Sequence, residues 1–135
     1  MTTKVLDSWA VVAFLLDEPA AEEVEKLLLS VAEEDTRALL CVVNWGEVYY
    51  SIARAESESI AEQKMRELAT LGIELVPVSD DLELVREAAR LKARHKMSYA
   101  DCFAAALAKI RNAELVTGDE EFRQVEKAIR VMWLR

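Results

Sequence analysis

The sequence is poor in the residues on which disulfide, zinc and nucleophilic-triad chemistry depends. Its 135 residues include two cysteines, one histidine, three glycines and two prolines. A single histidine argues against a His-rich zinc site and against a Ser-His-Asp triad. Both cysteines lie in apolar segments, which indicates small buried side chains in a reducing compartment. The few glycines and prolines, with a hydrophobic content of 53%, exclude a disordered or low-complexity chain.

Basic residues are also scarce, and no apolar run is long enough to span a bilayer. With 17 Lys and Arg against 25 Asp and Glu, the formal net charge is −8, which argues against a general nucleic-acid coating protein. A nucleic-acid enzyme is compatible with this charge, because bound cations offset metal-binding carboxylates. Residues 1–16 match a signal peptide poorly, because Asp7 interrupts the apolar stretch and Asp-Glu-Pro follows it. We expect a soluble cytoplasmic protein without a membrane partner.

The alternation of short apolar segments with helical periodicity predicts one α/β domain over residues 1–135. Its core would be a central parallel sheet of four to five short strands flanked by helices. Strands are predicted at residues 4–6, 38–43, 74–78, 114–117 and 129–133. Helices are predicted at residues 8–16, 20–32, 44–55 and 57–71, after a cap at Asp80, and at 98–112.

Four carboxylates follow apolar runs at points where a strand or its loop should give way to a helix: Asp7, Glu47, Asp101 and Asp119. The ends of parallel strands meet at one edge of a sheet, where open α/β folds bind ligands. Two such charges about 5 Å apart repel by about 3 kcal/mol at an effective dielectric constant of ~20. A hard divalent cation relieves this repulsion and takes oxygen ligands. The pattern therefore predicts a metal-dependent enzyme.

Helix capping explains each acid separately. Asn44-x-x-Glu47 and Ser98-x-x-Asp101 resemble capping boxes, and Asp7 and Asp119 are acceptable N-caps. Capping accounts for the place of each acid, whereas a shared metal accounts for the presence of all four. Neighbouring residues with a hydroxyl or amide group are candidates for holding a carboxylate or a metal-bound water: Ser8, Asn44, Ser98 and Thr117.

Six segments, in this order, resemble PIN-domain proteins of the VapC toxin type. They are VLDSWA at 5–10, DEPAA at 17–21, NWGEVYY at 44–50, MSYADCFAAALA at 97–108, LVTGDEEF at 115–122 and VMWL at 131–134. The resemblance covers nearly the whole chain. It departs from the family at Trp9, where a small residue is frequent, at Glu120, where Pro is frequent, and before Met97, where Gly is absent.

The resemblance implies a parallel sheet with an acidic site at the carboxyl ends of its strands. It also implies a Mg²⁺- or Mn²⁺-dependent endoribonuclease, the toxin of a type II toxin–antitoxin system that a cognate antitoxin inhibits. A homodimer or a toxin–antitoxin hetero-oligomer is expected. Asp7, Glu47, Asp101 and Asp119 match the family's acids, and Thr117 matches its supporting hydroxyl.

In the predicted mechanism, Asp7 and Asp101 are direct ligands of Mg²⁺, while Glu47 and Asp119 bind a second ion or act through water. The ion activates a water for in-line attack on the scissile phosphorus and stabilises the leaving oxygen. One-metal and two-metal versions are both open. No histidine base is needed, which suits a chain whose one histidine is His95.

Two pairs of residues are candidates for contacts with RNA or an antitoxin. Trp45 and Tyr49 are one helical turn apart and can stack on a base or hold a partner helix, or pack in the core. Arg94 and Lys96 belong to a basic cluster that can attract phosphates, or that complements a helix C-terminus.

The competing function is a non-catalytic PIN-like module that binds metal or protein. It predicts stabilisation by metal without RNA cleavage. A phospho-acceptor receiver domain is disfavoured, because Asp7 stands alone after its strand and LVTGD supplies no lysine.

Overall fold

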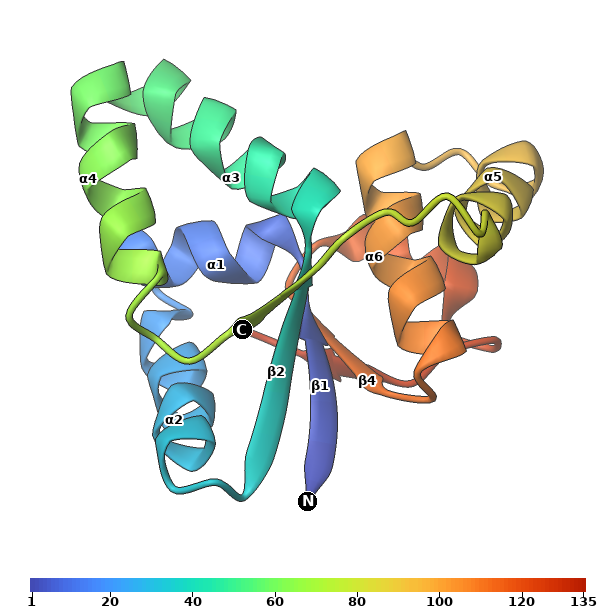
Figure 1. Cartoon of the computed structure of the whole chain (residues 1–135), viewed down its shortest axis with the longest axis horizontal. Coiled ribbons are helices and arrows are strands. Elements are labelled where there is room, and N and C mark those ends of the chain that lie inside the picture. Colours follow the sequence, from blue (N-terminus) through green and yellow to red (C-terminus); the bar gives the residue numbers. More distant parts are fainter.

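The computed structural model describes residues 1–135 and contains a five-stranded, fully parallel sheet with helices on both faces (Figure 1). The strand order is β3-β2-β1-β4-β5. The strands are β1 (Thr2–Leu6), β2 (Thr36–Cys41), β3 (Glu74–Val76), β4 (Glu114–Thr117) and β5 (Val131–Trp133). Each neighbouring pair is parallel. The expected sheet of four to five parallel strands flanked by helices is therefore confirmed.

The helices are α1 (Ser8–Leu15), α2 (Ala21–Ala32), α3 (Val42–Ala55), α4 (Glu58–Leu68), α5 (Glu83–Arg94) and α6 (Tyr99–Ile110), with the 3-10 helix η1 (Glu120–Val125). In Figure 1, α1 to α4 lie on one side of the sheet and α5 and α6 on the other. No helix has the length and apolar character needed to cross a bilayer.

The sheet divides the hydrophobic core in two, because successive side chains of a strand point to opposite faces. Val5 of β1 and Leu115 of β4 pack with α5 and α6. Leu6 and Val116, one residue further on, pack with α1 to α4. The central strands bury both faces, so their sequences are nearly continuous in apolar residues.

The chain changes direction across the sheet at β1. From β1 it proceeds to β2 and β3 on one side, and it then returns to β4 and β5 on the other. The reversal places a topological switch point between β1 and β4, and ligands of open α/β sheets bind at such points. Helix α1 begins immediately after β1, and η1 follows β4, so both elements begin at this edge.

Two expected helix starts are wrong. The segment predicted as strand to Val43 ends at Cys41, and α3 begins at Val42, so Asn44 lies inside the first turn and is not a cap. The apolar β-branched pair Val42–Val43 favoured a strand, but the pairing of β2 with β3 ends at Cys41. Asp80 does not cap α5 either: Leu82 precedes that helix with a left-handed φ of 66°.

Candidate active site

A cleft of about 240 Å³ lies at the carboxyl ends of the central strands. It is lined by Ser8, Trp9, Val12, Glu18, Glu47, Ser51, Asp101 and Asp119. Three of the four predicted acids therefore share one cleft. The fourth, Asp7, directly precedes Ser8 and is buried, and its pKa responds to the charges of Asp101 and Asp119.

Asp7 follows β1 and caps α1, as capping predicted. Its Oδ1 accepts a hydrogen bond from the Ala10 amide at 2.9 Å, and its Oδ2 accepts one from the Thr117 hydroxyl. Burial raises the pKa of Asp7 to about 8, mainly because an isolated charge is poorly solvated there. The two hydrogen bonds lower the pKa but do not offset the burial. A cation near this carboxyl would favour its ionised form.

Asp101 reaches the cleft from the first turn of α6. Helix α6 follows α5, whereas the helices at the other three acids (α1, α3 and η1) each follow a strand. Ser98 is the N-cap, and its Oγ accepts from the Asp101 amide at 3.1 Å, which confirms that half of the expected capping box. Burial, together with the charges of Asp119 and Glu47, raises the pKa of Asp101 to about 7.

Glu47 is held from two directions. Its Oε1 accepts from the Ser8 hydroxyl at 2.7 Å and from the Asn44 amide nitrogen at 3.2 Å. The same Asn44 nitrogen donates to the Ala100 carbonyl at 3.0 Å, which ties α3 to the start of α6. Asn44 Oδ1 is the one buried side-chain polar atom without a protein partner. Asn44 is therefore a positioning residue for Glu47 and not a helix cap.

Asp119 is linked to Asp7 through one hydroxyl. Thr117, fully buried at the end of β4, donates to Asp7 and accepts from the Asp119 amide at 3.0 Å. Asp119 also caps η1, with Oδ1 accepting from the Glu121 amide at 3.0 Å, as capping predicted. The carboxyl-terminal end of β4 thus supports two of the acids together.

The donor set fits a hard cation. The structure has seven ion pairs, and none of them includes any of the four acids, so their charge has no internal compensation. Carboxylate oxygens are the ligands that Mg²⁺ and Mn²⁺ prefer. In the side-chain positions described, however, no three Asp, Glu, His or Cys side chains converge closely enough to enclose a metal ion. The choice of direct ligands therefore stays a prediction.

The sequence reasoning did not predict four of the lining residues: Trp9, Val12, Glu18 and Ser51. Ser51 lies four residues after Glu47, and this helical spacing was a usable signal. Glu18 enters the cleft after α1, where Asp17 adopts a left-handed φ of 53°. Nothing in the sequence pattern indicated that turn. A second acid that the sequence reasoning missed, Glu121, lies close enough to raise the pKa of Asp101.

The four contact candidates lie outside the acidic cleft. The rings of Trp45 and Tyr49 stack at 6.1 Å between centroids and pack against the core beneath α1 to α4. Arg94 and Lys96 are exposed at the end of α5, and Lys96 is tied by its amide to Gln124 Oε1 at 3.0 Å. Core packing and helix-end complementation account for these positions, and contacts with a partner stay a prediction.

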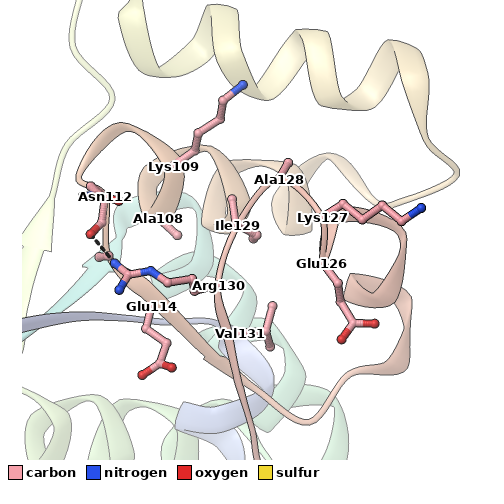
Figure 2. A pocket seen from close by; sticks show the side chains of 11 residues that line it. Ala108, Lys109, Asn112, Glu114, Glu126, Lys127, Ala128, Ile129, Arg130 and Val131 are labelled. Atoms are coloured by element: carbon pink, nitrogen blue, oxygen red, sulfur yellow. Dashed lines mark hydrogen bonds between the residues drawn. The ribbon is translucent and has the colours of Figure 1, made fainter.

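The largest cavity, about 600 Å³, lies elsewhere (Figure 2). It lies among the end of α6, the start of β4 and the segment leading into β5, where Arg130 donates to the Asn112 carbonyl at 2.7 Å. Glu114 of the cavity is the first residue of β4, whereas the acidic site lies at the carboxyl end of this strand, beyond Thr117. Cavity size therefore does not mark the acidic site.

Comparison with known proteins agrees with the fold and the motifs. The PIN domain family model matches residues 4–128. Ribonuclease VapC30 of Mycobacterium tuberculosis is 32% identical over 129 residues, covering 92% of this chain and 95% of the relative. Ribonuclease VapC of Mycolicibacterium smegmatis is 33% identical, covering 92% and 97%.

Solved structures share the fold at lower identity. VapBC2 of Rickettsia felis, bound to a promoter DNA fragment, aligns with a TM-score of 0.76 and 14% identity, covering 99% of this chain and 100% of that chain. VapC20 of Mycobacterium tuberculosis, a toxin that cleaves the sarcin-ricin loop, aligns with a TM-score of 0.71 and 17% identity, covering 90% and 94%. The expected family resemblance is thus confirmed, and the chain belongs to the PIN domain family.

Proposed function

We propose that this chain is a divalent-metal-dependent endoribonuclease, the toxin of a type II toxin–antitoxin system, acting as one PIN domain over residues 1–135. The observation that carries the proposal is the cluster of four carboxylates without a counter-charge at the switch point of the sheet. The names of its relatives, ribonucleases of the VapC type, support an RNA substrate.

Asp7 and Asp101 would hold the cation, with Glu47 and Asp119 joining directly, through water or at a second ion. Mg²⁺ is the proposed metal and Mn²⁺ an alternative. When bound, the cation supplies positive charge for the scissile phosphate and lowers the pKa of a coordinated water. The rest of the chain's contribution is orientation: Thr117 holds Asp7 against the Asp119 backbone, while Ser8 and Asn44 hold Glu47. These contacts reduce the freedom of the carboxylates before the cation arrives.

The protein partner would be a cognate antitoxin in the cytoplasm. Structures similar to this fold were solved as toxin–antitoxin complexes, including one from Klebsiella pneumoniae with a TM-score of 0.66. Trp45, Tyr49, Arg94 and Lys96 stay candidates for contacts with RNA or antitoxin. A homodimer or a toxin–antitoxin hetero-oligomer would be the working assembly.

The test is RNA cleavage by purified protein freed of any antitoxin. We expect cleavage in Mg²⁺, none in excess EDTA, and only a residual rate in Asp101→Asn, whose fold is checked by circular dichroism. Asp80→Asn is the matched control, because Asp80 is exposed and does not line the cleft. Equal cleavage by Asp101→Asn and wild type would contradict the proposal. Stabilisation by Mg²⁺ without any cleavage would favour the non-catalytic metal-binding module.

A further inference from the structure

Trp9 is held in a defined place beside the acids. Its indole lines the cleft with Glu47, Asp101 and Asp119. A Cβ built on Gly118 would overlap Cζ2, Cζ3 and Cη2 of the ring, so the outer edge of the indole occupies the space that this glycine leaves free. Gly118 separates Thr117 from Asp119, and the ring therefore contacts the backbone that carries the site.

Trp9 is only partly covered by the protein. Trp9 is 37% exposed, although a tryptophan gains most from complete burial. The indole lacks a polar partner in the structure. It is therefore a rigid, partly open aromatic surface, and rigid aromatic surfaces bind flat partners at low entropic cost.

We propose that Trp9 is a substrate-binding residue that stacks on an unpaired base next to the scissile phosphate. The inference rests on the proposed function and adds to it a base contact carried by a residue of this chain. A phosphate held at the acids of this site would lie in the same cleft as the ring, because Asp101 and Asp119 line that cleft with Trp9. The flanking base would then meet an aromatic face, whose stacking contributes affinity without reading base identity by hydrogen bonds.

The lining of the cleft favours a nucleotide over an apolar protein segment. Apart from Trp9, its one apolar residue is Val12. The remaining lining consists of two hydroxyl residues and four acids: Ser8, Ser51, Glu18, Glu47, Asp101 and Asp119. An apolar side chain inserted there would desolvate carboxylates without pairing them, which is costly. A nucleotide presents a stacking face and a metal-binding phosphate together.

Tryptophan fluorescence tests the contact directly. The chain has three tryptophans, so Trp45→Phe with Trp133→Phe leaves Trp9 as the one reporter. Stopped-flow mixing in Mg²⁺ records Trp9 emission before the oligomer is cleaved, with all four acids of the site in place. We expect a single-stranded oligoribonucleotide of mixed sequence to quench Trp9 emission with saturation. An abasic oligomer of equal length and charge should bind without quenching.

The matched control keeps Trp133 and replaces Trp9 and Trp45 by phenylalanine; its emission should not change. Unchanged Trp9 emission when anisotropy shows saturated oligomer binding would overturn the proposal, as would equal quenching by the abasic oligomer or a lack of saturable binding. A response of Trp9 to the cognate antitoxin but not to RNA would assign the ring to a protein interface and also overturn it.

Kinetics provide a second test in the otherwise wild-type protein. Trp9→Ala should raise KM about tenfold or more with little change in kcat, while Trp9→Phe should keep most of the affinity. Gly118→Ala should displace the ring and raise KM similarly, because the new Cβ takes the place of the ring edge. The backbone of Gly118 has no positive φ, so alanine causes no backbone strain there. In the Trp9→Ala background, Gly118→Ala should add nothing, which a general structural defect would not produce.

These tests separate the inference from the proposed function. Quenching of Trp9 by RNA in a protein that cleaves no RNA would contradict the proposed nuclease activity and support the base contact. Cleavage by Trp9→Ala with wild-type KM would support the proposed nuclease activity and contradict the base contact.

Discussion

Two buried groups of acids in this protein have opposite electrostatic surroundings. Glu87 of α5 is 8% exposed and pairs with Lys109 at 2.6 Å and Arg90 at 3.2 Å, and these hydrogen bonds lower its pKa. Asp7 and Asp101 are buried to a similar degree but have no cation, and burial raises their pKa values to about 8 and about 7.

The difference separates an acid that is paired with cations within the chain from acids that have no cation partner. Glu87 connects α5 to Lys109 of α6, and its charge is neutralised within the chain. The cleft acids take part in none of the ion pairs of the structure. Strongly perturbed carboxyls in a cleft are typical of functional sites, whereas internally paired ones are typical of structural sites.

Asp7→Asn should have the largest effect. It keeps an oxygen to accept from the Ala10 amide but removes the charge, so we expect cleavage to fall about 1,000-fold, or about 4 kcal/mol in activation free energy. The melting temperature should stay level or rise, because a buried carboxyl is replaced by a neutral amide. Single-turnover cleavage and thermal denaturation measure both. Wild-type activity in this variant would remove the distinction between the two groups.

Mg²⁺ should stabilise the cleft and leave the Glu87 region unaffected. At a Mg²⁺ concentration 100 times its Kd, the free energy of unfolding should rise by about 2.7 kcal/mol. Asp101→Asn should lose most of this gain, whereas Glu87→Gln should keep it. Denaturant unfolding at matched ionic strength, with NaCl as the control, gives the measurement. Equal stabilisation of Asp101→Asn and wild type would place the cation outside the cleft.

Glu87→Gln should destabilise the fold without affecting cleavage. Removing this charge leaves Lys109 and Arg90 without their partner, but both are about half exposed and water compensates them in part. We expect a loss of about 1–2 kcal/mol in the free energy of unfolding. Urea denaturation and RNA cleavage should be compared on the same preparation. A fall in cleavage larger than the unfolded fraction explains would show that Glu87 affects the site.

The two groups should also differ in pH dependence when EDTA is present. The pKa of Asp7 is about 8 in the folded chain against an ordinary 3.8, so the folded state holds a proton that the unfolded state releases. Stability from this group is complete below about pH 4 and declines as pH rises to about 8, by about 1.4 kcal/mol per pH unit at most. Asp101 acts in the same direction up to about pH 7.

Glu87 has the opposite sign, because its lowered pKa provides stability above its ordinary 4.5 that is lost in acid. Between pH 5 and pH 8 the free energy of unfolding should therefore fall with rising pH for wild type and Glu87→Gln. It should fall less steeply for Asp7→Asn. A slope that Asp7→Asn leaves unchanged would contradict the assignment.

Local patterns predicted much of the scaffold correctly. The strand at Glu114–Thr117 has the expected bounds, and Asp7, Ser98 and Asp119 act as caps. These features depend on residues within a few positions of one another, and local hydrogen bonds determine them. Asn44 failed as a cap because its side chain makes its bonds to Glu47 and to Ala100, and the bond to Ala100 spans 56 residues.

The sequence by itself determined the fold class and indicated which four acids gather at the cleft, because apolar periodicity and strand-to-helix transitions are written in adjacent residues. The tertiary structure alone decided that Thr117 joins Asp7 to Asp119, that Glu18 turns into the cleft, and that Gly118 leaves room for Trp9. Each of these depends on which strands are neighbours in the sheet and on the left-handed turn after α1. Chain reversals bring distant residues into contact, and spacing along the sequence does not encode that distance.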